Sequence, residues 1–166
     1  MNSLLAIDPG ASGGLAWRSN DGTVYAVAMP DGMTATVDTL RSIAASNPGI
    51  RATVEKVGDY MPGNSGPAAV TFAEHCGGLR WSLYALGIPQ DREPAPRTWQ
   101  KAIGVPVEPP LSKDMDKDAK RRELAARKQR RKKWVQDAMA RRYPHLRVTL
   151  ATADALGILT WREGQV

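Results

Sequence analysis

The sequence predicts an α/β domain whose central sheet is mixed, with five strands and flanking helices. Two observations support this class. The chain opens with three short apolar segments separated by turn signals, which is typical of an antiparallel meander. Apolar residues then recur at helical spacing in longer segments that alternate with further short strands, which is typical of parallel strands joined by helices.

The meander is expected at residues 4–7, 15–17 and 24–29. Each segment is short and dominated by apolar residues, as a buried strand would be. The first ends in Asp8-Pro-Gly, which favours a turn, and Asp21-Gly marks a hairpin between the second and third. These turns make the first three strands sequential neighbours.

A helix over residues 36–46 and a strand over 51–57 are expected next. In that strand Thr53, Glu55 and Val57 share one face, because side chains alternate along a strand. A Gly- and Pro-rich loop then leads to a long helix over 67–86, with Pro67 in its first turn.

The last third of the chain is expected to be mainly helical. A short extended piece at 94–96 and a helical turn at 98–103 precede a Pro-rich link at 104–112. Residues 114–143 predict one long helix or two stacked ones, and 152–161 a final helix. We expect residues 1–166 to form a single domain.

Composition narrows the class of protein. With 42% apolar and 24% charged residues, the chain resembles an ordinary globular domain rather than a disordered one. A single cysteine, Cys76, excludes an internal disulfide framework and suits a reducing compartment. The N-terminal segment lacks the features of a signal peptide, and no apolar run approaches the roughly 20 residues of a membrane span. We therefore expect a cytoplasmic protein without membrane contact.

The positive charge is concentrated in one segment. Residues 114–143 hold 12 Lys/Arg and 5 Asp/Glu, a net +7, whereas the rest of the chain holds 11 and 12, a net −1. Such a basic stripe attracts a polyanion such as nucleic acid through counterion release. A solvated, self-repelling helix face stays open as the alternative.

Three acids occupy positions where an acid is a poor structural choice. Asp8 ends an apolar strand, Glu55 lies in a strand beside Val54 and Val57, and Asp154 lies in the first turn of an apolar helix. Carboxylates that converge need a cation, and Mg²⁺ prefers oxygen ligands. Taken singly, each has an ordinary interpretation: a turn former, an exposed edge residue and a favourable charge near a helix N-terminus.

The ordered set of motifs resembles the RuvC-type Holliday-junction resolvases. The first is Leu5-Ala-Ile-Asp-Pro-Gly-Ala-Ser-Gly-Gly-Leu-Ala, the second Val54-Glu-Lys-Val, and the last Ala153-Asp-Ala-Leu. Between them, Tyr60-Met-Pro-Gly-Asn-Ser, Leu86-Gly-Ile-Pro and Pro96-Arg-Thr-Trp-Gln-Lys are similar to the shorter resolvase-like proteins of bacteriophages.

This resemblance implies a ribonuclease H-like fold, a homodimer and Mg²⁺-dependent nicking of four-way DNA junctions. Asp8, Glu55 and Asp154 would be the catalytic metal ligands for two Mg²⁺ ions, for which Mn²⁺ would substitute. The family usually has a fourth carboxylate three or four residues before the last one, but Ala151 and Leu150 stand there. Thr152, metal-bound water or another acid is expected to take its place, unless the protein is weakened in catalysis.

Further residues are expected to contact DNA. By resemblance, Lys101 and Lys117 would touch phosphates. From charge alone we expect contacts from the basic segment, at Arg130, Arg131, Lys132 and Lys133. Tyr60 and Met61 are candidates to stack on or wedge between opened bases. Solvated lysines and an aromatic loop anchor are the ordinary alternatives.

Several functions remain open at this point. The main hypothesis is an endonuclease for branched DNA, with the helix after Pro67, bearing Trp81 and Tyr84, as its dimer contact or simply as core. A catalytically silent junction-binding protein would account for the missing acid. A nuclease for RNA or hybrid substrates is a third class. An actin-like sugar kinase would need a second phosphate-binding loop and a much longer chain.

Overall fold

A computed structural model describes residues 3–57 and 66–165 and contains a five-stranded mixed sheet in the order β3-β2-β1-β4-β5. The strands β1 (Leu4–Asp8), β2 (Gly14–Arg18) and β3 (Val24–Ala28) form the antiparallel meander. The strands β4 (Arg51–Val54) and β5 (Gln90–Arg92) extend it in parallel on the other side of β1. The predicted mixed sheet is thus confirmed.

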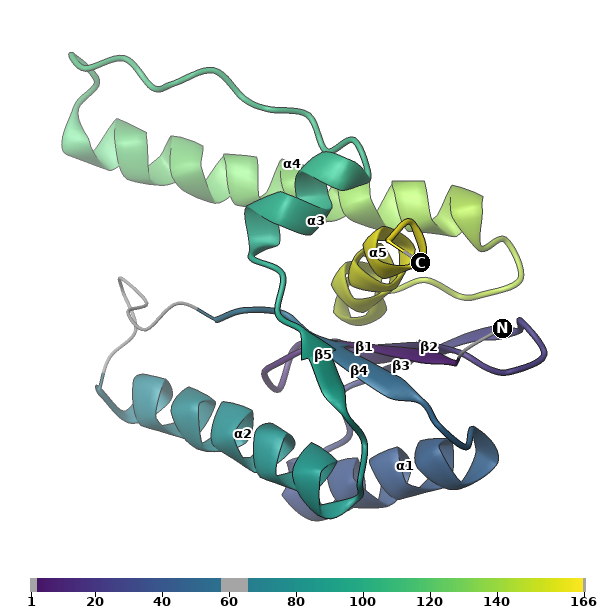
Figure 1. Cartoon of the computed structure of the whole chain (residues 1–166). Helices are drawn as coiled ribbons and strands as arrows, with labels where there is room; N and C mark the ends of the chain where they lie inside the picture. The colour runs from purple at the N-terminus through teal and green to yellow at the C-terminus, as the bar shows by residue number, and fades with distance from the viewer. Residues whose placement is uncertain (1–2, 58–65, 166) are drawn as a thin grey trace.

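Two layers of helices cover the sheet (Figure 1). One face carries α1 (Gly32–Ser46) and α2 (Gly66–Ala85). The opposite face carries α3 (Pro96–Ala102), α4 (Lys117–Arg142) and α5 (Leu150–Glu163), with α5 lying against the strands and α4 outside it. No helix of the described residues is long and apolar enough to cross a membrane.

The alternation of side chains along β1 divides the core between these two faces. Leu5 and Ile7 are fully buried and pack with the cluster that includes Leu40 of α1. Leu4 and Ala6 point the other way and pack with the α4 and α5 cluster. Because Asp8 continues the series of Leu4 and Ala6, it belongs to the α5 face.

One expectation about the elements needs correction, and two open alternatives are settled. The fifth strand is Gln90–Arg92 rather than residues 94–96. It is a polar edge strand, so no apolar pattern in the sequence marks it. Asp91 is held there by Arg51 at 3.1 Å and by Arg162 at 2.7 Å. The basic segment forms one helix, α4, rather than two. On α2, Trp81 is 73% and Tyr84 79% exposed, so these two side chains are not core.

Candidate active site

Asp8 and Glu55 lie side by side at the ends of two central parallel strands. Ile7 pairs with Val54 in the β1–β4 register, and the backbone N–H of Glu55 donates to the Ile7 carbonyl at 3.0 Å. One further step in this register places Glu55 next to Asp8. Paired residues of neighbouring strands point to the same face, so both carboxylates face α5.

Helix α5 brings Asp154 to the same face of the sheet. The helix starts at Leu150 because Thr149 and Thr152 form a capping box, in which the Thr149 backbone N–H donates to the Thr152 hydroxyl at 3.0 Å. Its first turn also approaches β2 closely, since a Cβ on Gly14 would lie 2.4 Å from the Ala151 carbonyl oxygen. Gly14 therefore allows the approach that carries Asp154 to the strand ends.

The three carboxyl groups act on one another electrostatically. Burial, and then the charges of Glu55 and Asp154, raise the pKa of Asp8 to about 8. Burial likewise raises the pKa of Glu55, with Asp154 adding to it, and burial raises the pKa of Asp154. A site that raises the pKa of three carboxyl groups disfavours their ionised forms, and a bound cation would reverse this effect.

These acids do not form a finished metal cage. Within residues 3–57 and 66–165, no group of three or more His, Cys, Asp or Glu side chains is arranged so that it could hold a metal ion. Mg²⁺, however, usually binds through one or two carboxylates together with water and substrate phosphate oxygens. The donor set therefore suits a divalent ion that a DNA phosphate helps to hold.

A buried tryptophan holds Glu55, and sequence reasoning missed it. The indole Nε1–H of Trp99, in α3, donates to Glu55 Oε1 at 2.7 Å. Trp99 is 0% exposed. The motif that begins at Pro96 contains Trp99, but 44 positions separate the two partners and no local pattern links them.

Two basic residues of α4 act on the acids. The charge of Lys132 lowers the pKa of Asp8 and of Asp154, and that of Arg131 lowers the pKa of Glu55 and of Asp154, although burial outweighs both. Both residues were predicted from charge to contact DNA. Their influence on the acids places this turn of α4 beside the carboxylates.

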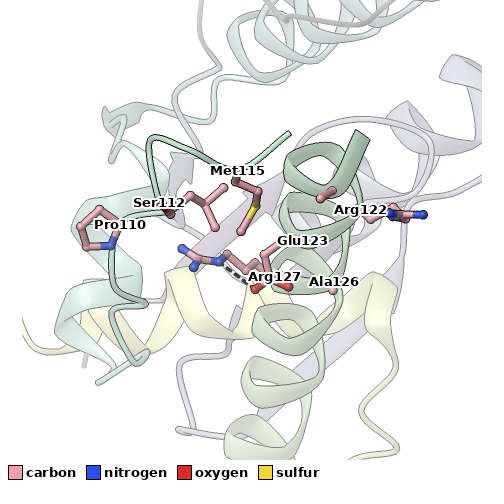
Figure 2. A pocket seen from close by; sticks show the side chains of 9 residues that line it. Pro110, Ser112, Met115, Arg122, Glu123, Ala126 and Arg127 are labelled. Carbon is pink, nitrogen blue, oxygen red and sulfur yellow. Dashed lines mark hydrogen bonds and ion pairs between the residues drawn. The ribbon is translucent and has the colours of Figure 1, made fainter. Parts of the chain in front are cut away.

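The neighbouring basic residues are engaged within the chain. Arg130 contacts Glu108 at 2.7 Å and Glu123 at 2.8 Å, and Arg127 pairs with the same two acids. Figure 2 shows the Arg127–Glu123 pair at the pocket between α4 and the preceding segment. Lys133 pairs with Asp137 at 2.9 Å. Part of the positive stripe is therefore neutralised internally.

The other expected DNA contacts lie at different places. Lys101 is exposed near the end of α3, and Lys117 is exposed at the start of α4. Tyr60 and Met61 lie outside the described residues.

The position of the family's fourth acid has no carboxylate. Ala151 is half-buried against Gly14, and Leu150 is 47% exposed. Thr152 is 4% exposed and its hydroxyl is engaged in the capping box, so it serves the helix rather than the acids. The carboxylates that raise the pKa of Asp8 are Glu55 and Asp154.

Comparison with solved structures identifies the fold. The structure of Thermus thermophilus RuvC in complex with a Holliday junction substrate matches with a TM-score of 0.57 and 14% identity, over 97% of this chain and 92% of that one. The fold is that of RuvC. A second Thermus thermophilus RuvC structure gives a TM-score of 0.50 and 15% identity over 98% and 96% of the two chains.

Sequence comparisons add nothing to this likeness. No family model matches the chain, and no curated protein matches it. The predicted ribonuclease H-like α/β class is confirmed by the RuvC structures. At such low identity the likeness extends to the fold, and the activity has to be argued from the residues of this chain.

Proposed function

We propose that this protein is a Mg²⁺-dependent endonuclease that cuts Holliday junctions or related branched DNA. The observation that carries the proposal is the placement of Asp8 and Glu55 side by side on the face that α5 supplies with Asp154. Half-buried acids whose pKa is raised are costly to a fold, and a reaction that depends on a bound cation would explain why they are present. The RuvC fold, seen elsewhere with a Holliday junction, supports the choice of substrate.

Each residue of the site would have its own role in the reaction. Asp8, Glu55 and Asp154 would supply the carboxylates that hold the divalent ions. Divalent ions bound there would activate a water molecule and stabilise the leaving 3′ oxygen of a phosphodiester. Trp99 keeps the Glu55 carboxylate in place through its indole N–H.

Helix α4 is the proposed DNA-binding element. Lys132 and Arg131 lie close enough to influence the carboxylates and would meet the phosphates next to the scissile one. Lys117, at the N-terminal end of α4, and Lys101 of α3 are exposed for backbone contacts. Such contacts give affinity that falls with salt and carries no sequence preference. Work on DNA of this kind would place the protein in the cytoplasm of a bacterium or of a phage-infected cell.

A homodimer would give the enzyme two sites for symmetric cutting, and α2 is its proposed interface. Trp81 and Tyr84 are exposed and contact each other edge to face, and Val70 is 57% exposed on the same helix. Large exposed aromatic side chains that share one helix mark an interaction surface. A Trp81→Ala/Tyr84→Ala variant should sediment as a monomer while its far-ultraviolet spectrum stays unchanged; a variant that remains dimeric would exclude this interface.

The test of function compares labelled four-way junction with matched duplex, with and without Mg²⁺, and maps every nick. The proposal expects paired nicks in the junction alone, only with Mg²⁺ or Mn²⁺, leaving 5′-phosphate and 3′-hydroxyl ends. Equal cutting of duplex would refute the proposed selectivity for branched DNA. Cutting of an RNA strand in a hybrid would instead indicate a nuclease for RNA or hybrid substrates.

The second candidate is a junction-binding protein that has lost catalysis. It is favoured by the absence of an acid at Ala151 and Leu150 and of a preformed metal-ligand group among the described residues. This candidate predicts tight, selective junction binding and no nicks at any Mg²⁺ or Mn²⁺ concentration. The same gel experiment separates the two candidates.

A further inference from the structure

We propose that Trp99 is a positioning residue that sets both the orientation of Glu55 and the spacing between Glu55 and Asp154. The inference rests on the proposed function, since it assigns Trp99 a task in holding the metal ligands. It is carried by two contacts of one buried side chain, one to Glu55, the residue after β4, and the other to the α5 backbone.

The first contact fixes Glu55. The indole N–H donates to Oε1 at 2.7 Å, which occupies one carboxylate oxygen and leaves Oε2 for another ligand. An indole carries no charge, so it orients the carboxylate without competing with a cation, as an arginine or lysine would. Trp99 is 0% exposed, so water does not replace this donor readily.

The second contact fixes α5. A Cβ on Gly157 would lie 2.6 Å from Trp99 Cζ3 and 3.0 Å from Cε3, so the ring lies directly on the helix backbone at that point. Gly157 follows Asp154 by three residues and therefore shares its side of the helix, one turn further on. A single rigid ring thus contacts both Glu55 and the helix that carries Asp154.

A purely structural tryptophan also seeks a partner for its N–H when it is buried. In that interpretation the ring matters for stability and the identity of the acceptor is incidental. The positioning role differs because it requires the hydrogen bond itself to control how the acids bind a divalent ion. The two interpretations diverge when the ring is kept and the donor is removed.

Trp99→Phe makes that change, and Trp161→Phe is the matched control because Trp161 packs against the same core cluster. Mn²⁺ binding to the protein–junction complex, followed by the electron paramagnetic resonance of free Mn²⁺, is the readout that does not depend on cleavage. Loss of the bond should weaken Mn²⁺ binding about tenfold and raise the Mg²⁺ concentration for half-maximal nicking by a similar factor. Junction affinity in EDTA should stay as in the wild type.

The results overturn the proposal if Trp99→Phe binds Mn²⁺ as tightly as the wild type, or if Trp161→Phe weakens binding equally. If the wild type itself makes no nicks while Trp99→Phe weakens Mn²⁺ binding, the nuclease function fails and the role of Trp99 stands. If the wild type nicks and Trp99→Phe has the same Mg²⁺ dependence, the role of Trp99 fails alone.

A further measurement covers a Trp99→Phe variant that does not fold. The chain has five tryptophans, so its indole N–H groups are few enough to follow by nuclear magnetic resonance. In the wild type one indole signal should exchange slowly with solvent, and Glu55→Ala should shift that signal and speed its exchange. If no indole signal responds to Glu55→Ala, the hydrogen bond and the proposal with it are refuted.

Discussion

Beneath α1 and α2 the packing is aliphatic, with Leu5 and Ile7 of β1 and Leu40 of α1 all 0% exposed, whereas beneath α4 and α5 it is interrupted by acids. The same strands supply both faces, because successive side chains of β1 and β4 point to opposite faces of the sheet. On the first face the buried aliphatic side chains lower the free energy of the folded chain. On the second, Asp8, Glu55 and Asp154 are held against their preference for water.

One face of the sheet thus contributes mainly to stability, and the other carries the side chains proposed for the reaction. Removing apolar volume from the α1 face should weaken the fold and leave the reaction of each folded molecule unchanged. Removing a carboxylate from the α5 face should do the opposite: it should abolish the reaction and raise the free energy of unfolding.

The largest expected effect is that of Asp8→Asn on cleavage. The amide retains the shape of the carboxyl group and loses the charge, so nicking of a four-way junction should fall at least about a thousandfold, a barrier increase of about 4 kcal/mol. Junction binding in EDTA above pH 8, where the Asp8 carboxylate is ionised, should be equal or tighter, because a negative charge that faces phosphate is removed. Unchanged nicking at ordinary Mg²⁺ concentration would refute the assignment of Asp8 as a catalytic metal ligand.

Leu40→Ala tests the opposite face. Leu40 is fully buried in α1, so its truncation should lower the free energy of unfolding by about 3 kcal/mol, measured by urea titration. The nicking rate per folded molecule should equal that of the wild type at low temperature. A loss of rate beyond the loss of folded protein would mean that the two faces are coupled.

A smaller effect concerns pH. The pKa of Asp8 is raised to about 8 in the folded chain from an ordinary value of 3.8, so between these values the folded state holds a proton that the unfolded state releases. The free energy of unfolding in EDTA should therefore fall as the pH rises from about 4 to about 8. Asp8→Asn should flatten this dependence and be more stable than the wild type at pH 8, by roughly 1–3 kcal/mol. If the free energies of unfolding of the two proteins changed with pH in parallel, the claim that burial disfavours the charged form of Asp8 would be contradicted.

The smallest expected effect concerns the neutralised arginines of α4. Glu108→Gln removes a partner of Arg127 and Arg130, which should make both more available to phosphate. Junction affinity in EDTA should rise about twofold to fivefold, and its salt dependence should become steeper by up to about one unit of slope. Unchanged affinity would place this part of α4 away from the DNA.

The acids and the sheet could be predicted because their signals are local. Asp8 ends an apolar strand and Glu55 alternates with Val54, so sequence spacing placed both on one face, and the described register agrees. The five-stranded mixed sheet followed from turns and from helices between strands. The short polar strand at Gln90–Arg92 was missed because its place depends on Asp91 meeting Arg51 and Arg162, residues far apart in the sequence.

The supporting contacts could not be predicted, since they depend on three-dimensional packing. Trp99 meets Glu55 across 44 residues, and Glu108 meets Arg130 across 22. Charge density predicted that Arg130 and Lys133 would face DNA as strongly as Arg131 and Lys132 would, yet the first two are paired within the chain while the second two act on the acids. Apolar spacing on α2 likewise could not distinguish a buried stripe from one exposed at Trp81 and Tyr84.

A crystal structure of the protein with junction DNA and Ca²⁺, a divalent ion that should bind without supporting turnover, tests the central claim most directly. The account predicts Ca²⁺ within about 2.6 Å of oxygens from Asp8, from Glu55 or Asp154, and from a backbone phosphate. Bound DNA whose nearest phosphate lies away from these acids, with no ion between them, would contradict it.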